Sequence, residues 1–222
     1  MSRRAAALFA FAVLSPGCVP VTEPVGDIDK AEPDKALVGT WVTAAKVKDK
    51  EAFRLSEEVK LQIEKAPGVK GNPKGLMLLT PIGYPFPGGK ESVTFSFFVT
   101  TIGKEQYGNL LLDADDKLGL ARLGKEGAYA GWSQGAGRRY VVFRYAATKD
   151  GLTLNSGDEE AFKALMKDEK FPRDDKKLAS QIKDANWFSY KTPAGWLAKY
   201  LEKNGPGRIF PAAKDVKYVR GN

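Results

Sequence analysis

The stretch Val93-Thr-Phe95-Ser-Phe97-Phe-Val99-Thr100 decides the fold class, because apolar and polar side chains alternate along it. Its odd positions are apolar and most of its even positions are polar, which is the period-two pattern of a β-strand with one buried face. The same alternation occurs where Val59, Leu61 and Ile63 are separated by polar residues. Both segments are therefore predicted strands that contribute one face to a core.

Shorter apolar stretches on both sides extend this pattern into a β-meander. Further strands are expected at residues 37–47, 75–80, 106–112, 118–123, 140–146, 152–154 and 216–220. Turn-forming pairs such as Pro67-Gly68 and Asp150-Gly151 stand between the strands. Short strands at spacings of roughly ten residues predict a mainly-β fold, with an antiparallel sheet that is closed into a barrel or strongly curved.

Two helices are expected in the C-terminal third of the chain. The first is indicated by Ser156-Gly-Asp-Glu159, which has the spacing of a capping box. Its apolar face comprises Phe162, Leu165 and Met166. The second is indicated by Thr192-Pro193, which is typical of a helix start, and by Asn204-Gly205, which is typical of a helix end. The connector at 167–183 has room for a third short helix.

The N-terminus has the pattern of an export signal. Two arginines precede a ten-residue apolar run at positions 5–14, and the small residues Ser15 and Gly17 stand just before Cys18. Ten helical residues cover roughly 15 Å, about half of a bilayer's hydrocarbon core, so the run is too short to span a membrane. We therefore predict a signal peptide at 1–17. Since no later segment approaches eighteen apolar residues, the mature chain is expected to be soluble.

The residues before Cys18 resemble the lipobox of bacterial lipoproteins, in which the cysteine is acylated and becomes the new N-terminus. The match departs from the usual box at Ser15, which stands where an aliphatic residue is typical. An ordinary signal peptidase would cut the same bond and leave a free thiol, so both routes stay open. The resemblance implies a membrane anchor at Cys18, in a protein that faces the periplasm or the cell surface.

Residues 18–35 combine three prolines with acidic residues and show no hydrophobic period. This composition predicts a flexible tether that reaches on the order of 20 Å. The rest of the chain, 36–222, is then expected to fold as a single domain and to be monomeric.

The tripeptide Gly39-Thr-Trp41, on the first expected strand, resembles the Gly-x-Trp signature of lipocalins. In that family the tryptophan closes the base of a β-barrel, and an arginine near the C-terminus packs over it. The resemblance implies this role for Arg220, with Arg208 as a second choice. The overall layout is similar to small bacterial lipoproteins with a lipocalin-like domain, and it covers residues 36–147. The family's second signature, a Thr-Asp-aromatic stretch, is not found.

Motifs for catalysis and metal binding are incomplete. Gly131-Trp-Ser-Gln-Gly135 matches the nucleophile elbow of hydrolases, but the chain has no histidine to take the serine proton. With no histidine and one cysteine, the usual zinc ligands are missing. The carboxylates at 113–116 lack the spacing of a calcium loop. We therefore expect no enzyme activity, no cofactor and no metal ion.

The charge of the chain favours an anionic envelope surface over nucleic acid. Its 35 basic and 27 acidic residues give a net charge of +8, and loss of Arg3 and Arg4 with the signal peptide leaves +6. The cations are scattered among acidic residues and form no basic stripe with aromatic residues, so no nucleic-acid partner is expected. Weak attraction to anionic lipid head groups fits the pattern better.

Two functions remain open, because an eight-stranded barrel either encloses one small ligand or fills with its own side chains. The first is a lipid-anchored protein that binds or carries an apolar small molecule inside the barrel. The same positions are candidates for cavity lining and for a solid core: Val59, Leu61, Ile63, Phe95, Phe97, Val99, Val141, Phe143 and Tyr145. The alternative is a filled barrel that binds an envelope protein or polymer through its loops, with Tyr84 and Phe86 as contact residues.

Overall fold

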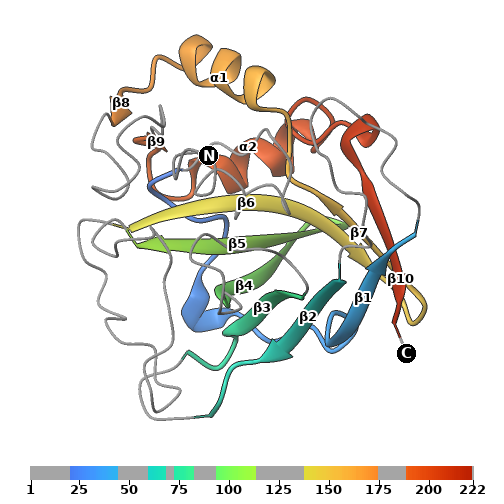
Figure 1. Cartoon of the computed structure of the whole chain (residues 1–222). Coiled ribbons are helices and arrows are strands. Elements are labelled where there is room, and N and C mark those ends of the chain that lie inside the picture. Colours follow the sequence, from blue (N-terminus) through green and yellow to red (C-terminus); the bar gives the residue numbers. More distant parts are fainter. Residues whose placement is uncertain are drawn as a thin grey trace, which may run out of the picture.

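The computed structural model describes residues 21–44, 60–68, 73–82, 94–113, 138–174 and 189–221. Eight strands of these segments close into an antiparallel barrel in the order β1-β10-β7-β6-β5-β4-β3-β2 (Figure 1). Their bounds are β1 Gly39–Thr43, β2 Lys60–Lys65, β3 Met77–Ile82, β4 Phe95–Ile102, β5 Glu105–Asp113, β6 Arg138–Ala147, β7 Gly151–Asn155 and β10 Val216–Arg220. The predicted mainly-β barrel is confirmed.

From β1 to β7 each strand pairs with the next one along the chain. After β7 the chain leaves the barrel and returns as β10, which closes it by pairing with both β7 and β1. The excursion holds α1 (Glu159–Asp168), β8 (Arg173–Asp174), β9 (Ser189–Tyr190), α2 (Trp196–Asn204) and the 3-10 helix η3 (Ala212–Lys214). Another 3-10 helix, η2 (Ile28–Lys30), precedes the barrel.

The sequence placed both helices correctly but placed their starts wrongly. Asp158, not Ser156, caps α1, because its side chain accepts a hydrogen bond from the Ala161 N–H at 2.9 Å. In α2 the N-cap is Gly195 in a left-handed conformation, so the helix starts after the expected Thr192-Pro193. The α2 end at Asn204 agrees with the expectation.

Large side chains fill the barrel interior. They form one cluster in which no member is more than 6% exposed: Leu37, Trp41, Leu61, Ile63, Met77, Leu79, Phe95, Phe97, Val99, Leu110, Val141, Phe143, Tyr145, Leu152, Leu154 and Tyr218. A void large enough for water would leave the atoms that line it accessible. These side chains therefore pack against one another, and no ligand cavity lies among them in the part of the barrel that the structure describes.

Close packing inside the barrel depends on a glycine. A Cβ atom at Gly108 on β5 would overlap the ring of its cross-strand partner Phe143 on β6. Because residue 108 has no side chain, the Phe143 ring fits over it. Its ring centroid lies 5.9 Å from that of Phe97 and 6.3 Å from that of Tyr145. The missing side chain thus makes room for an aromatic group that fills the interior.

Replacing this glycine tests the packing. Gly108→Ala should lower the free energy of unfolding by about 1–3 kcal/mol, because an overpacked core must shift its side chains or backbone. Gly207→Ala is the control, since a Cβ atom there meets nothing within 4 Å. Chemical denaturation of both variants measures the effect. A Gly108→Ala protein as stable as the control would mean that the interior has spare room.

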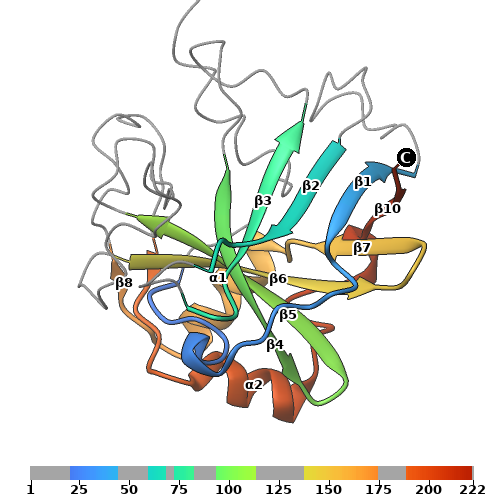
Figure 2. The ribbon, with the colours of Figure 1, turned by 90° about the horizontal axis from the view of Figure 1, so that it is seen from below.

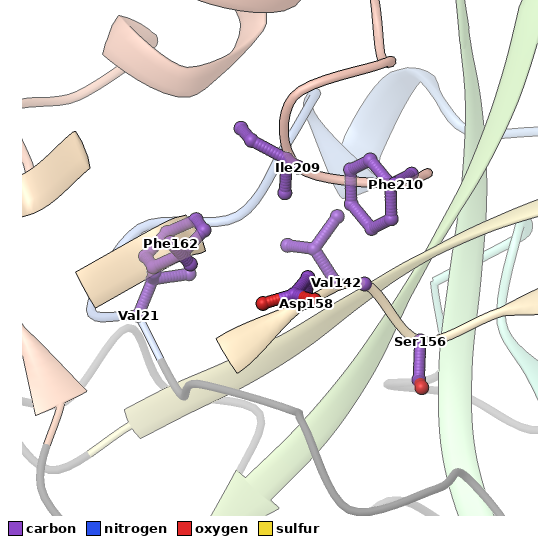
Figure 3. Close-up of a pocket in the computed structure, with 8 residues that line it drawn as sticks. Val21, Val142, Ser156, Asp158, Phe162, Ile209 and Phe210 are labelled. Carbon is purple, nitrogen blue, oxygen red and sulfur yellow. The ribbon is translucent and has the colours of Figure 1, made fainter. Parts of the chain in front are cut away.

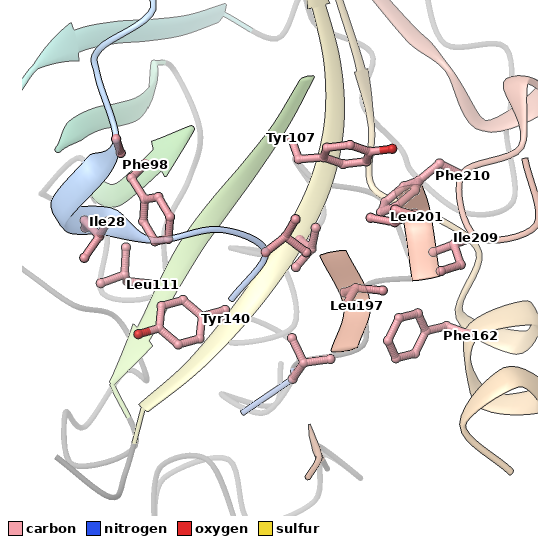
Figure 4. Packing of buried hydrophobic residues seen from close by; sticks show 14 of the residues in the cluster. Ile28, Phe98, Tyr107, Leu111, Tyr140, Phe162, Leu197, Leu201, Ile209 and Phe210 are labelled. Carbon is pink, nitrogen blue, oxygen red and sulfur yellow. The ribbon is translucent and has the colours of Figure 1, made fainter. Parts of the chain in front are cut away.

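A second apolar cluster covers the outer surface of β4, β5 and β6. Phe98, Tyr107, Leu111, Tyr140 and Val142 point outward from these strands into this cluster. They are covered by residues from the N-terminal segment, α1, α2 and the turn before η3: Val21, Val25, Ile28, Phe162, Leu165, Met166, Leu197, Leu201, Ile209 and Phe210 (Figure 4). These three strands are therefore buried on both faces, and Figure 2 shows α2 and the N-terminal segment on their side of the barrel.

The expected tether at 18–35 is wrong for the residues that the structure describes. Val21 exchanges two backbone hydrogen bonds with Tyr140 on β6, at 2.9 and 2.8 Å. The buried side chain of Asn109 on β5 donates to the Val25 carbonyl and accepts from the Val25 N–H, both at 2.7 Å. The few apolar residues of this segment are enough to hold it, because they dock onto an apolar sheet face that local composition does not reveal.

Asn109 offers a test of this attachment. Asn109→Ala should lower the free energy of unfolding by about 2–4 kcal/mol, because both Val25 backbone groups lose their buried partner. Hydrogen exchange in residues 21–35 should increase more than exchange in the barrel strands. Asn204→Ala, at an exposed position on α2, is the matched control. Unchanged exchange in residues 21–35 would contradict the role of Asn109.

The buried Tyr218 is expected to make the folding stability of the barrel fall at alkaline pH. It is 4% exposed inside the barrel, and burial raises its pKa from 10.0 to about 12. Because the unfolded chain loses this proton first, the stabilisation is complete below pH 10 and is lost as the pH rises towards 12. Over that window the stability of the wild type should fall more steeply than that of Tyr218→Phe, by about 1.4 kcal/mol per pH unit. Equal slopes in denaturation series would contradict this burial.

Candidate functional site

A pocket of about 460 Å³ lies at the end of the barrel where β4 runs into β5 and β6 ends. Residues 27–34, which include η2, form one wall of the pocket. The other wall comes from the strands, with Thr100 and Thr101 on β4, Gln106 on β5 and Tyr145 on β6. A volume of this size is in the range that small-molecule sites occupy.

The carboxylate of Asp34, which lines the pocket, accepts three hydrogen bonds. The Tyr145 hydroxyl donates to its Oδ2 atom at 3.0 Å, and the Gln106 side-chain amide donates to the same atom at 3.3 Å. Its Oδ1 atom accepts from the Ala36 N–H at 2.8 Å. These contacts fix the carboxylate over the end of the filled interior, to which Tyr145 belongs.

Tyr145 acts as a permanent hydrogen-bond donor in this pair. Burial raises its pKa well above the ordinary value, and the charge of Asp34 together with the hydrogen bond to it raises the pKa further. The hydroxyl therefore stays protonated over the whole neutral range and orients the carboxylate. Sequence reasoning identified Tyr145 as an interior residue but missed Asp34, which lies 111 positions away in the chain.

The pocket is negatively charged although the whole chain is basic. Asp27, Glu32 and Asp34 line it together with one cation, Lys30, whose ammonium group pairs with Asp27 at 3.4 Å. Carboxylates and the Gln106 and threonine side chains can accept hydrogen bonds from a positively charged group. Among the described residues, no three or more acidic, cysteine or histidine side chains are grouped so that they could hold a metal ion.

A second pocket is too small for a ligand. It lies between the outer surface of β6 and the C-terminal excursion, where Val142, Phe162, Ile209 and Phe210 converge (Figure 3). Its volume is about 10 Å³, which is about what one water molecule needs. It is a gap in the packing of the outer apolar cluster.

Trp41 and Arg220 lie together at the end of the barrel that carries the large pocket. They are cross-strand partners on β1 and β10, and the guanidinium carbon lies 4.4 Å from the centroid of the indole ring. The Trp41 ring N–H donates to the Leu37 carbonyl at 2.7 Å, and Arg220 donates to the Val38 carbonyl at 2.7 Å. This is the contact that the lipocalin resemblance implies for Arg220. The second choice, Arg208, instead pairs with Asp168 at 2.7 Å.

The remaining candidate residues fall into two groups. The structure brings eight of the nine predicted lining positions together in the interior cluster: Leu61, Ile63, Phe95, Phe97, Val99, Val141, Phe143 and Tyr145. Other predicted positions lie outside the described residues: Cys18, Val59, Tyr84, Phe86 and the motif at 131–135.

Comparison with protein-family models, with curated proteins and with solved structures gives no match to this chain. Within the described segments, neither helix has the length and apolar character needed to cross a bilayer.

Proposed function

We propose that this chain is an exported, lipid-anchored protein of the bacterial cell envelope, in which the barrel is a filled scaffold and ligands bind at its surface. The observation that carries this proposal is the interior cluster, whose members are at most 6% exposed. An apolar carrier needs a cavity of several hundred Å³ within its walls. Of the two functions that the sequence left open, the packing favours the filled barrel.

The anchor is proposed from the sequence. Cys18 follows a short apolar signal and stands where a lipobox would place its acylated residue. Several acyl chains on one residue suffice for stable membrane attachment. We place the folded body in the periplasm or at the cell surface, attached through Cys18.

The pocket beside Asp34 is the ligand site that we propose for this module. The pocket holds three carboxylates and one lysine, so it carries an excess of negative charge, and Tyr145 holds the Asp34 carboxylate in place. Such a site favours an amine-bearing small molecule or an amine-bearing group of an envelope component. Coulomb attraction near a protein surface is strong enough to select charge without a deep cavity. Contacts through Tyr84 and Phe86 remain a further route by which an envelope protein or polymer would bind.

Binding of spermidine, measured by calorimetry at low salt, tests the pocket. Asp34→Asn should weaken binding roughly tenfold, because it removes a charge and with it a charge-assisted hydrogen bond. Glu202→Gln, which removes an exposed carboxylate on α2 outside the pocket, is the matched control and should bind as the wild type does. Citrate should not bind at this site. Equal affinity of the two variants, or no binding by the wild type, would refute this site.

Fractionation of cells tests the anchor separately. The wild type should stay with the membranes after a high-salt wash, and Cys18→Ser should be released, because acyl chains resist salt and surface charge does not. A Cys18→Ser protein that still pellets with the membranes after the wash would contradict the proposed acyl anchor at Cys18.

A further inference from the structure

Three half-buried aromatic side chains form a continuous surface where α1 ends and α2 begins. The ring of Phe171, three residues after α1, meets the ring of Trp196 edge-on, with centroids 4.7 Å apart. Trp196 in turn lies 5.4 Å from Tyr200, one turn further along α2. We call these three residues and the lysines around them the aromatic surface. It lies on the outside of the cluster that covers β4–β6.

A strained backbone turn positions Phe171. Lys170 adopts a left-handed conformation, with φ at 57°, which is rare for residues other than glycine. Its N–H donates to the Lys167 carbonyl at 3.1 Å, and the Phe171 N–H donates to the Met166 carbonyl at 3.0 Å, which together make a Schellman motif. This helix end brings Phe171 against Trp196 and leaves the Lys170 side chain exposed.

Exposed lysines stand on the segments that carry these aromatic rings. On α2, Lys199 and Lys203 lie on the helix face of Trp196 and Tyr200, because residues three and four positions apart are neighbours on a helix. Glu202, three positions after Lys199, lies at the edge of this helix face. In all, five exposed lysines stand on these segments: Lys167, Lys170, Lys191, Lys199 and Lys203. Two carboxylates stand at the end of α1: Asp168, which is paired with Arg208, and the exposed Glu169.

The chain that would carry the lipid begins beside this surface. The Thr22 N–H donates to the Tyr190 carbonyl at 3.1 Å, and the next residue, Lys191, donates its N–H to the Pro172 carbonyl at 3.0 Å. Residue 21 is thereby fixed next to the end of β9 (Figure 1). Cys18 stands three positions before Val21, so it lies within roughly 11 Å of it even if the chain is fully extended. With the anchor proposed above, the point of lipid attachment is therefore held within that distance of Val21, beside the segment that leads to Phe171.

We propose that the aromatic surface lies against the anionic lipid head groups of the membrane that holds the anchor. Aromatic rings favour the boundary between apolar and polar layers, and each lysine near an anionic surface adds about 1 kcal/mol of attraction. The barrel then docks on the bilayer with a fixed face and does not swing on a tether. This proposal rests on the proposed acyl anchor for its orientation, but the lipid contact of the surface is testable without it.

The first experiment uses the mature chain with Cys18→Ser, which removes the anchor and leaves the surface intact. It should cosediment with vesicles of equal parts phosphatidylglycerol and phosphatidylcholine, and more weakly with phosphatidylcholine alone. Adding Lys199→Gln and Lys203→Gln should weaken binding to the anionic vesicles roughly thirtyfold. The control carries Lys65→Gln and Lys217→Gln, two exposed positions on β2 and β10, and loses the same net charge.

The outcomes separate the surface from general charge attraction. A larger loss in the Lys199/Lys203 variant than in the control supports the proposal. Equal losses in the two variants overturn it, because binding would then depend on net charge alone. An absence of binding to the anionic vesicles also overturns it. Thermal unfolding of each variant checks that the fold is retained.

A footprint of the acylated wild type separates this proposal from the anchor. In vesicles, Lys199 and Lys203 should be protected from amine acetylation several-fold more than Lys65 and Lys217. Attachment to vesicles with equal labelling of the four lysines would refute the docked face and leave the anchor standing. Failure of the acylated chain to attach at all would refute the anchor, whereas vesicle binding by the unacylated chain would still support the surface.

Discussion

The interaction on which the structure depends is the contact between side chains from all eight strands inside the barrel. A closed sheet has an interior of fixed width, and its side chains must either meet or leave a cavity. Here Phe143 lies over the bare backbone of Gly108 and reaches Phe97, so aromatic rings occupy the space that a ligand would need. The filled interior supports the proposal that this barrel is a scaffold whose ligands bind at its surface.

Burial of the second face of β4, β5 and β6 has its own consequence. The outward-facing Phe98, Tyr107 and Leu111 need a cover, which the N-terminal segment and the two helices supply. The same contacts fix the chain close behind Cys18 to the barrel wall. The segment that was expected to be a flexible tether thus fixes the orientation of the barrel relative to the anchor that we propose.

Much of the barrel could be predicted from the sequence because strand alternation is local. The inward positions on β2, β4 and β6 follow from the period of two, and the pairing of Trp41 with Arg220 follows from the lipocalin resemblance. Whether the interior is full depends on the summed volumes of many strands, which no single segment shows. The contacts of Asp34 with Tyr145 and of Val25 with Asn109 join residues 111 and 84 positions apart, so local patterns carry no sign of them.

Native mass spectrometry tests the filled barrel most directly. The mature chain with Cys18→Ser, purified without detergent from cells that export it, should show the mass of the polypeptide with no lipid-sized adduct. A reproducible lipid-sized adduct, released by organic solvent, would contradict the filled interior and restore the apolar carrier as the function.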